Sequence, residues 1–156
     1  MSDLTIGKLR GLQQLANERG VFAMLALDHR ESLCAALNPA APGEVPYERM
    51  VELKLSLTRA LAPLASAVLL DPVYGAAQAI GRGALPGSVG LVVSLEASGY
   101  DGEDGARRTT LLPGWGVSKV RRMGASAAKL LLYYHPEAST AEEQERLVGA
   151  VGWDCR

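Results

Sequence analysis

Four short apolar runs recur along the chain, and each is followed by polar or turn-forming residues and then by a helix-like segment. The runs cover residues 21–27, 65–70, 89–95 and 127–134. Strands that are half exposed to water alternate apolar and polar side chains, whereas parallel strands covered on both faces are apolar throughout. The pattern therefore predicts an α/β fold with a parallel sheet, and it does not fit an all-β fold.

The segments between these runs carry the end signals and the apolar spacing of helices. Pro46 suits the first turn of a helix, and Pro63 ends the same segment. Within it, apolar residues recur at helical spacing at Met50, Leu53, Leu57 and Leu61. Gly124 ends another helix, whose apolar side consists of Val117, Val120 and Met123. A last helix opens with Ser139 and Glu142, which have the spacing of a capping box.

A first helix is predicted over residues 5–18, ahead of the first strand. Its apolar side consists of Leu9, Leu12 and Leu15. A helix in this place is expected to pack over the bottom of a barrel.

Length and composition fit one globular domain. The chain has 156 residues, of which 48% are apolar and 21% charged, and such a chain forms a single domain with a substantial core. The formal net charge of −1 argues against the clustered basic surface of a nucleic-acid-binding protein. We therefore expect one domain over residues 1–156 with no nucleic-acid partner.

The cysteines and the N-terminal residues indicate a cytoplasmic protein. Cys34 and Cys155 lack the paired spacing of zinc sites or redox motifs, so both are expected to be inert thiols in a reducing compartment. The first residues lack a basic region followed by an apolar stretch, and no apolar run reaches the roughly 18 residues of a membrane span. No membrane partner is expected.

Polar residues follow each apolar run where the predicted strand ends. In chain order these are Asp28-His29-Arg30, Asp71-Pro72, Glu96 and His135-Pro136. Ligands bind at the C-terminal ends of parallel strands in both barrels and open α/β sheets. The four groups together therefore predict a ligand site at this edge of the sheet.

Lys129 is a cation within the fourth apolar run. An ammonium group is costly to bury without a partner, and Asp28 is the natural counter-charge if Lys129 points into a barrel interior beside the first strand. Such a pair is suited to bind a phosphorylated sugar or to hold a substrate hydroxyl while a proton moves. The alternatives are a purely structural ion pair or a lysine that points outward at a strand edge.

The other polar groups also have structural interpretations. Asp71-Pro72 fits a strand-ending turn, and Asp28 fits the cap of a helix that begins near Glu31. His29 and His135, the only histidines, are too isolated to indicate a metal site, and both are expected to be exposed. Residues 99–108 are predicted to form a mobile loop. They are not a nucleotide-binding motif, because they lack the glycine pattern of a phosphate-binding turn that opens a helix.

Five stretches of the sequence resemble tagatose-1,6-bisphosphate aldolases, in the same order and at similar spacing. The resemblance extends over nearly the whole chain and also takes in the related sulfofructose-phosphate aldolases, although the second and fifth stretches are closer to the tagatose branch. The stretches are Ala26-Leu27-Asp28-His29-Arg30, Leu69-Leu70-Asp71-Pro72-Val73-Tyr74-Gly75, Ser98-Gly99-Tyr100-Asp101, Trp115-Gly116-Val117-Ser118-Lys119 and Lys129-Leu130-Leu131-Leu132-Tyr133-Tyr134.

The resemblance implies a (β/α)₈ barrel and a class I aldolase, which needs no metal or other cofactor. Such an enzyme cleaves a ketose bisphosphate to dihydroxyacetone phosphate and glyceraldehyde 3-phosphate through a lysine Schiff base, which acts as the electron sink. By the same resemblance Asp28 and Lys129 are expected to be catalytic. His29, Arg30 and Asp71, which stand at the predicted strand ends, are expected to bind substrate. His29 stands where the tagatose enzymes usually have glutamine, so its role departs from the pattern.

The sequence provides four of the eight strands that this family implies. The family's catalytic glutamate lies on the fifth strand, its Schiff-base lysine on the sixth, and its phosphate-binding groups on the last two. We therefore expect residues 1–156 to be the N-terminal half of the barrel, truncated and inactive alone. Its open sheet edges should favour association, including a homo-oligomer. A fragment, an interrupted gene and a half-barrel that pairs with another chain all fit this expectation.

Two alternatives to this function stay open. Lys129 itself is the Schiff-base lysine if the chain resembles transaldolases, which carry theirs on the fourth strand; this requires a lowered lysine pKa, which the nearby Asp28 opposes. A non-catalytic remnant or interaction module is the other alternative. The sequence does not choose among tagatose, fructose and sulfonated ketose phosphates.

Overall fold

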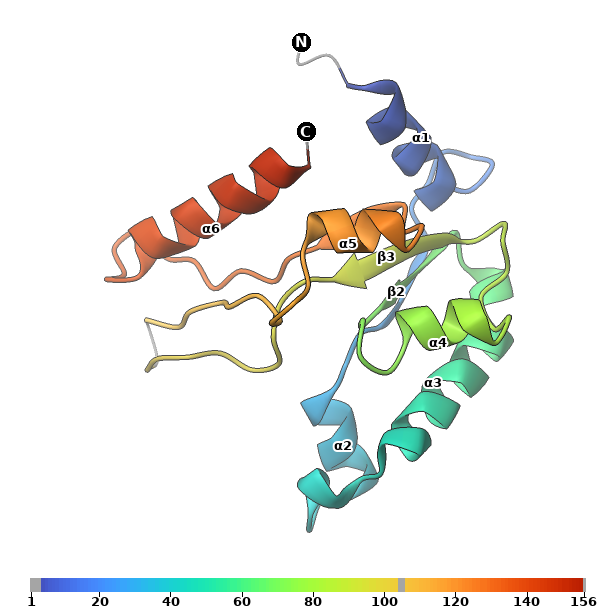
Figure 1. Cartoon of the computed structure of the whole chain (residues 1–156), viewed down its shortest axis with the longest axis horizontal. Coiled ribbons are helices and arrows are strands. Elements are labelled where there is room, and N and C mark those ends of the chain that lie inside the picture. Colours follow the sequence, from blue (N-terminus) through green and yellow to red (C-terminus); the bar gives the residue numbers. More distant parts are fainter. Residues whose placement is uncertain (1–3, 104–105, 156) are drawn as a thin grey trace.

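The fold centres on a parallel sheet, as the apolar runs predict. The computed structural model of the chain describes residues 4–103 and 106–155, and in them the sheet has four strands in the order β1-β2-β3-β4. All neighbouring strands are parallel (Figure 1). The strands are β1 (Met24–Leu27), β2 (Ala67–Leu70), β3 (Gly90–Ser94) and β4 (Ala127–Lys129).

A helix follows every strand, which gives four consecutive βα units. The α-helices are α1 (Ile6–Leu15), α2 (Glu31–Leu37), α3 (Tyr47–Leu61), α4 (Ala76–Gly81), α5 (Val117–Arg122) and α6 (Ala141–Asp154), with short 3₁₀ turns η1 (Pro42–Glu44) and η2 (Ala62–Leu64). Strand order that follows chain order, with one helical crossover per strand, is the arrangement of half a (β/α)₈ barrel. In the described residues β1 and β4 each pair on one side only.

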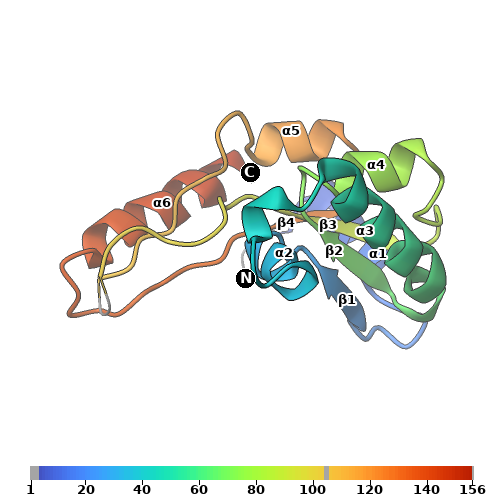
Figure 2. The ribbon, with the colours of Figure 1, turned by 90° about the horizontal axis from the view of Figure 1, so that it is seen from below.

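The larger hydrophobic core lies between one face of the sheet and helices α3, α4 and α5 (Figure 2). Alternate strand residues point to this face, as the two-residue period requires. The buried members that form the layer are Val68, Leu70, Leu91 and Val93 from the strands and Val51, Leu55, Ala76, Ala79 and Val120 from the helices. Helix α6 packs beside α5 (Figure 1).

Helix α1 covers the N-terminal ends of the strands on the opposite face. Leu15 packs there with Ala67 and Val92, as expected for a helix at the bottom of the sheet. A Cβ atom at Gly90 would lie 2.4 Å from the carbonyl oxygen of Gln14, and one at Gly11 would lie 2.6 Å from that of Ser126. The helix approaches so closely only because both positions are glycine.

Two predicted apolar faces are partly wrong. On α1, Leu9 and Leu12 are 44% and 40% exposed, because the helix meets the sheet mainly through its last turn. On α3 the buried residues are Met50, Val51, Lys54, Leu55 and Thr58, so only Met50 of the predicted stripe is fully buried. The buried face of α3 includes Lys54, because an ion pair with Asp71 allows its side chain to lie in the core.

The fourth predicted strand is shorter than its apolar run. Regular pairing stops at Lys129, and residues 130–134 continue without strand structure. Their backbone bonds go to side chains instead: the Leu131 amide donates to Glu96, and the Tyr133 amide donates to the Thr109 hydroxyl. Residues 130–134 of the predicted strand are therefore not part of the sheet.

Two further predicted elements differ in detail. Helix α6 has Thr140 at its N-cap with no side-chain capping bond, so the capping box at Ser139 and Glu142 is wrong. In the segment predicted as a loop, Asp101 pairs with Arg108 in an isolated bridge; residues 104–105 of that segment lie outside the described residues. No helix of the described residues is both long and apolar enough to cross a bilayer.

We expect Gly90→Ala to lower the free energy of unfolding by about 1–3 kcal/mol, the range for overpacking a core. The new methyl group meets a backbone oxygen that has no flexible side chain to move aside. Urea unfolding followed by circular dichroism measures the change. Gly87→Ala is the matched control, since a Cβ there has nothing within 4 Å. Equal stability of the two variants would contradict the close approach of α1.

Candidate active site

The C-terminal ends of three strands bring a lysine and two carboxylates together. Lys129 is the last residue of β4, Asp28 directly follows β1, and Glu96 lies two residues beyond β3. The lysine Nζ atom lies 3.0 Å from Asp28 Oδ2 and also hydrogen-bonds to Glu96 Oε1. The prediction that Asp28 is the counter-charge of Lys129 is therefore confirmed by the geometry.

The pair of Lys129 with Asp28 requires a curled sheet. Strands β1 and β4 are three strand spacings apart, which in a flat sheet is about 14 Å. The side chains of Lys129 and Asp28, with 3.0 Å between Nζ and Oδ2, are together too short to bridge that distance between strands. The pair therefore closes across a concave face, as in the interior of a barrel.

The three side chains differ in their access to solvent. Lys129 is 29% exposed, Asp28 15% and Glu96 6%. The cluster is thus half-enclosed and open on the side of the ammonium group. A polar ligand that approaches the strand ends can reach Lys129 and Asp28 without a rearrangement of the core.

The environment of Lys129 keeps it protonated. Burial lowers the pKa of Lys129, but the hydrogen bonds that it donates to Glu96 and Asp28, together with their negative charges, outweigh burial and raise the pKa above its ordinary value of 10.5. At neutral pH the group is an ammonium ion that donates hydrogen bonds. It is suited to hold a substrate oxygen and unsuited to attack a carbonyl.

Glu96 is fixed by contacts at both its side chain and its backbone. Its Oε2 atom accepts a hydrogen bond of 3.1 Å from the Leu131 amide, and its carbonyl oxygen accepts one of 2.6 Å from Arg30 Nη2. The guanidinium group of Arg30, predicted to bind substrate, thus joins the end of β1 to the end of β3. Arg30 is also the N-cap residue of α2, so Asp28 does not cap that helix.

Asp71, the third predicted substrate-binding residue, is fully buried and bonded within the protein. Its Oδ1 atom accepts hydrogen bonds from the amides of Val73 at 2.9 Å and Tyr74 at 2.7 Å, which is the strand-ending turn that the sequence offered as its alternative. Its Oδ2 atom lies 2.7 Å from Lys54 Nζ. These contacts give Asp71 a structural role.

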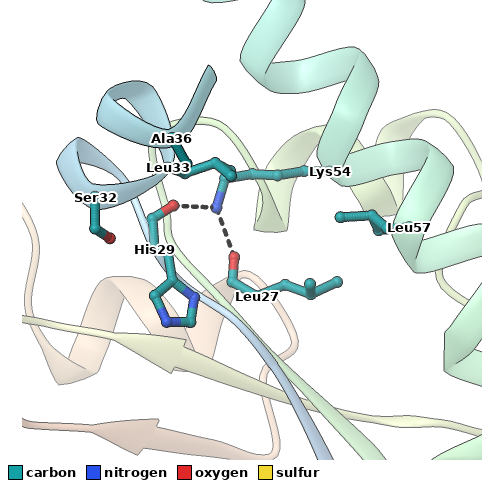
Figure 3. A pocket seen from close by; sticks show the side chains of 7 residues that line it. All are labelled: Leu27, His29, Ser32, Leu33, Ala36, Lys54 and Leu57. Atoms are coloured by element: carbon teal, nitrogen blue, oxygen red, sulfur yellow. Dashed lines mark hydrogen bonds between the residues drawn. The ribbon is translucent and has the colours of Figure 1, made fainter. Parts of the chain in front are cut away.

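His29 lies beside a small pocket between α2 and α3. The pocket has a volume of about 280 Å³ and is lined by Leu27, His29, Ser32, Leu33, Ala36, Lys54 and Leu57 (Figure 3). The two histidines, His29 and His135, are exposed, as predicted. Across residues 4–103 and 106–155, no three histidine, cysteine or acidic side chains gather in a way that could hold a metal ion.

Lys54 was missed from the sequence, and Glu96 was named only as one of the polar residues at the strand ends. Glu96 stands after the third apolar run, but no partner for it was proposed there. Lys54 interrupts the apolar side of α3, and a lysine among apolar helical positions was the signal that could have found it. Both take their importance from partners distant in the sequence.

Comparison with known proteins decides the family. A model described as DeoC/LacD family aldolase matches residues 22–156. The chain belongs to this family.

Curated relatives of this DeoC/LacD chain carry a more specific name. This chain is 35% identical to the tagatose 1,6-diphosphate aldolase of Listeria monocytogenes serotype 4a (strain HCC23), over 100% of the chain and 46% of the relative. It is 32% identical to tagatose 1,6-diphosphate aldolase 2 of Streptococcus agalactiae serotype III (strain NEM316), over 97% of the chain and 46% of the relative. The same identity holds for tagatose 1,6-diphosphate aldolase 1 of Enterococcus faecalis (strain ATCC 700802 / V583), over 99% of the chain and 47% of the relative. The chain spans about half the length of the curated relatives it matches.

The stabilisation that Lys129 provides to this DeoC/LacD chain should be lost at high pH. A group whose pKa is raised by folding stabilises the fold fully below its unfolded pKa, here about 10.5, and loses this effect as the pH rises through its folded pKa. The difference in free energy of unfolding between the wild type and Lys129→Gln should therefore be constant from pH 8 to pH 10 and shrink above about pH 10.5.

Urea unfolding at a series of pH values measures this difference. Lys8→Gln, which removes an exposed lysine on α1, is the matched control and should show no such loss. A Lys129→Gln difference that grows with pH would contradict the proposed electrostatics.

Proposed function

We propose that this chain carries part of the active site of a class I aldolase that cleaves tagatose 1,6-bisphosphate to dihydroxyacetone phosphate and glyceraldehyde 3-phosphate. The observation that carries the proposal is the Lys129 ammonium held between the carboxylates of Asp28 and Glu96 at the C-terminal ends of the strands. The tagatose 1,6-diphosphate aldolase name of its relatives supports the substrate class.

The cluster fits the proton transfer that carbon–carbon cleavage needs. In the reverse aldol step the hydroxyl on C4 loses its proton, its C–O bond becomes a carbonyl, and the C3–C4 bond breaks. The electron pair from that bond passes to C3 and into the substrate iminium. A carboxylate of the cluster accepts the hydroxyl proton, and the ammonium group holds the same oxygen by a hydrogen bond. We assign these roles to Asp28 and Lys129, with Glu96 orienting the lysine.

The chain's own lysines are poorly suited to form the iminium. A Schiff-base lysine needs a lowered pKa, from an apolar pocket or a neighbouring cation, but Lys129 lies between two anions. Lys54 is buried in an ion pair, Lys119 lies 4.0 Å from the centre of the Trp115 ring, and Lys8 is exposed on α1 at the other end of the sheet. We therefore propose that the nucleophile is a lysine other than these four, and the transaldolase-like alternative loses support.

A cytoplasmic location agrees with this proposal. Both cysteines, Cys34 and Cys155, are free thiols, as expected in a reducing compartment. A homo-oligomer that joins the sheet edges stays a prediction from the sequence.

Tagatose 1,6-bisphosphate should protect Lys129 from acetylation. The substrate's oxygens occupy the open side of the ammonium group, so labelling by acetic anhydride at fixed pH should slow, as read by peptide mass spectrometry with Lys8 as internal reference. Asp28→Asn should weaken the protective affinity about ten- to a hundredfold, because it removes a charge-assisted hydrogen bond.

Asp101→Asn is the control for this experiment, as the same substitution at an exposed loop position. It should leave protection unchanged. If the bisphosphate at high concentration leaves the labelling of Lys129 unaltered, the proposed substrate site is rejected.

Borohydride reduction in the presence of dihydroxyacetone phosphate should give no adduct on any of the four lysines. Lys129 is held as an ammonium ion by its two carboxylates and Lys54 is buried in an ion pair, so neither is suited to attack the ketone, and cleavage by the chain alone should also be undetectable. A class I aldolase treated in parallel verifies the trapping chemistry. An adduct on Lys129 would show that this lysine is itself the nucleophile, against the role assigned here.

A further inference from the structure

Lys54 is a fully buried ionisable group that the proposed reaction does not use. Its side chain is 1% exposed within α3. A buried ammonium is tolerated only where acceptors replace its water. Lys54 Nζ donates hydrogen bonds to the carbonyl oxygens of Leu27 at 2.5 Å and His29 at 2.7 Å, and it forms an ion pair with Asp71 Oδ2 at 2.7 Å. Two carbonyl groups and one carboxylate thus take the place of water around the ammonium group.

The two carbonyl groups flank Asp28 in the chain. Figure 3 shows both hydrogen bonds converging on the lysine nitrogen from the end of β1. In an extended segment, neighbouring side chains point to opposite faces. A clamp on residues 27 and 29 from the helix-covered side therefore fixes Asp28 toward the other side, where its carboxylate meets Lys129.

The lysine itself is fixed by the turn after β2. Asp71 accepts hydrogen bonds from the amides of Val73 and Tyr74 at Oδ1, so its carboxylate cannot rotate freely. Gly75 packs over it: a Cβ there would lie 3.2 Å from Asp71 Oδ2 and 3.1 Å from the Asp71 carbonyl oxygen. The ends of two neighbouring strands and α3 are thus joined at one nitrogen atom.

We propose that Lys54 is a positioning residue for the active site. By binding the backbone of residues 27 and 29, Lys54 holds Asp28 in contact with Lys129. The catalytic meaning of this role rests on the proposed aldolase function, but the positioning itself does not. A buried ion pair commonly adds little net stability compared with apolar residues of the same volume. The pattern of its bonds, on both sides of one active-site residue, favours a role in placing that residue.

The test is the reactivity of Lys129, which needs no sugar phosphate. The labelling rate of Lys129 by acetic anhydride is measured across a pH series in the wild type, Lys54→Met, Asp28→Asn and the double variant. If Lys54 acts through Asp28, Lys54→Met should speed the labelling of Lys129 about three- to tenfold at pH values below the pKa of Lys129. This is the size of effect expected when the charged form of Lys129 loses a hydrogen bond. The pH profile should move in the same direction as in Asp28→Asn.

The double variant separates positioning from a general loosening of the fold. In the Asp28→Asn background, Lys54→Met should have no further effect on Lys129, while labelling of Lys8 should be the same in all four proteins. Circular dichroism verifies that each is folded. If Lys54→Met does not fold, Asp71→Asn is compared in its place; it keeps the lysine but weakens its anchor, so Lys129 should again react faster.

Two results would overturn the proposal: a folded Lys54 or Asp71 variant with wild-type reactivity at Lys129, or an effect that adds in full to that of Asp28→Asn. Failure of the aldolase function has a different signature. In that case Lys54 still controls Lys129, but tagatose 1,6-bisphosphate does not protect it.

Discussion

The contact between Lys129 and Asp28 joins the two outermost strands of the sheet. Strands at opposite edges of a four-stranded parallel sheet do not meet unless the sheet curls. The core beneath α3, α4 and α5 supplies the convex side of that curl, and the lysine and its carboxylates occupy the concave side. The position of the candidate site and the barrel-like shape of the sheet are therefore two aspects of one geometry.

Two lysines show how the same chemical group acquires different properties from its surroundings. Lys54 is held by two carbonyl groups and one carboxylate and is closed to solvent, so it can only hold structure in place. Lys129 has two carboxylate partners and keeps an open side, so it can still bind a ligand. Charge and residue type are identical, and the difference lies in how many acceptors are fixed around the nitrogen atom.

Much of this arrangement follows from the sequence because it depends on local patterns. Apolar runs specify parallel strands, and the polar residue after each run specifies the edge at which a site forms. The pairing of Asp28 with Lys129 was also predictable, since a cation in an apolar strand needs a nearby anion. The partners of Lys54 were not, because helix periodicity does not describe Asp71 or the carbonyl groups of Leu27 and His29, which come from other parts of the chain. The extent of β4 was missed for a related reason, since amides beyond Lys129 bond to side chains of a distant loop.

The sequence separation of the site's contacts has a consequence for folding kinetics. Each strand pairs with the next strand in the chain, so the sheet can grow one βα unit at a time, and each step closes only the segment between neighbouring strands. The contact between Lys129 and Asp28 instead joins residues 101 positions apart in the chain. The two side chains come within reach of each other only when all four strands are in place. The ion pair is then a late event in folding, and its formation reports that the curled sheet is complete.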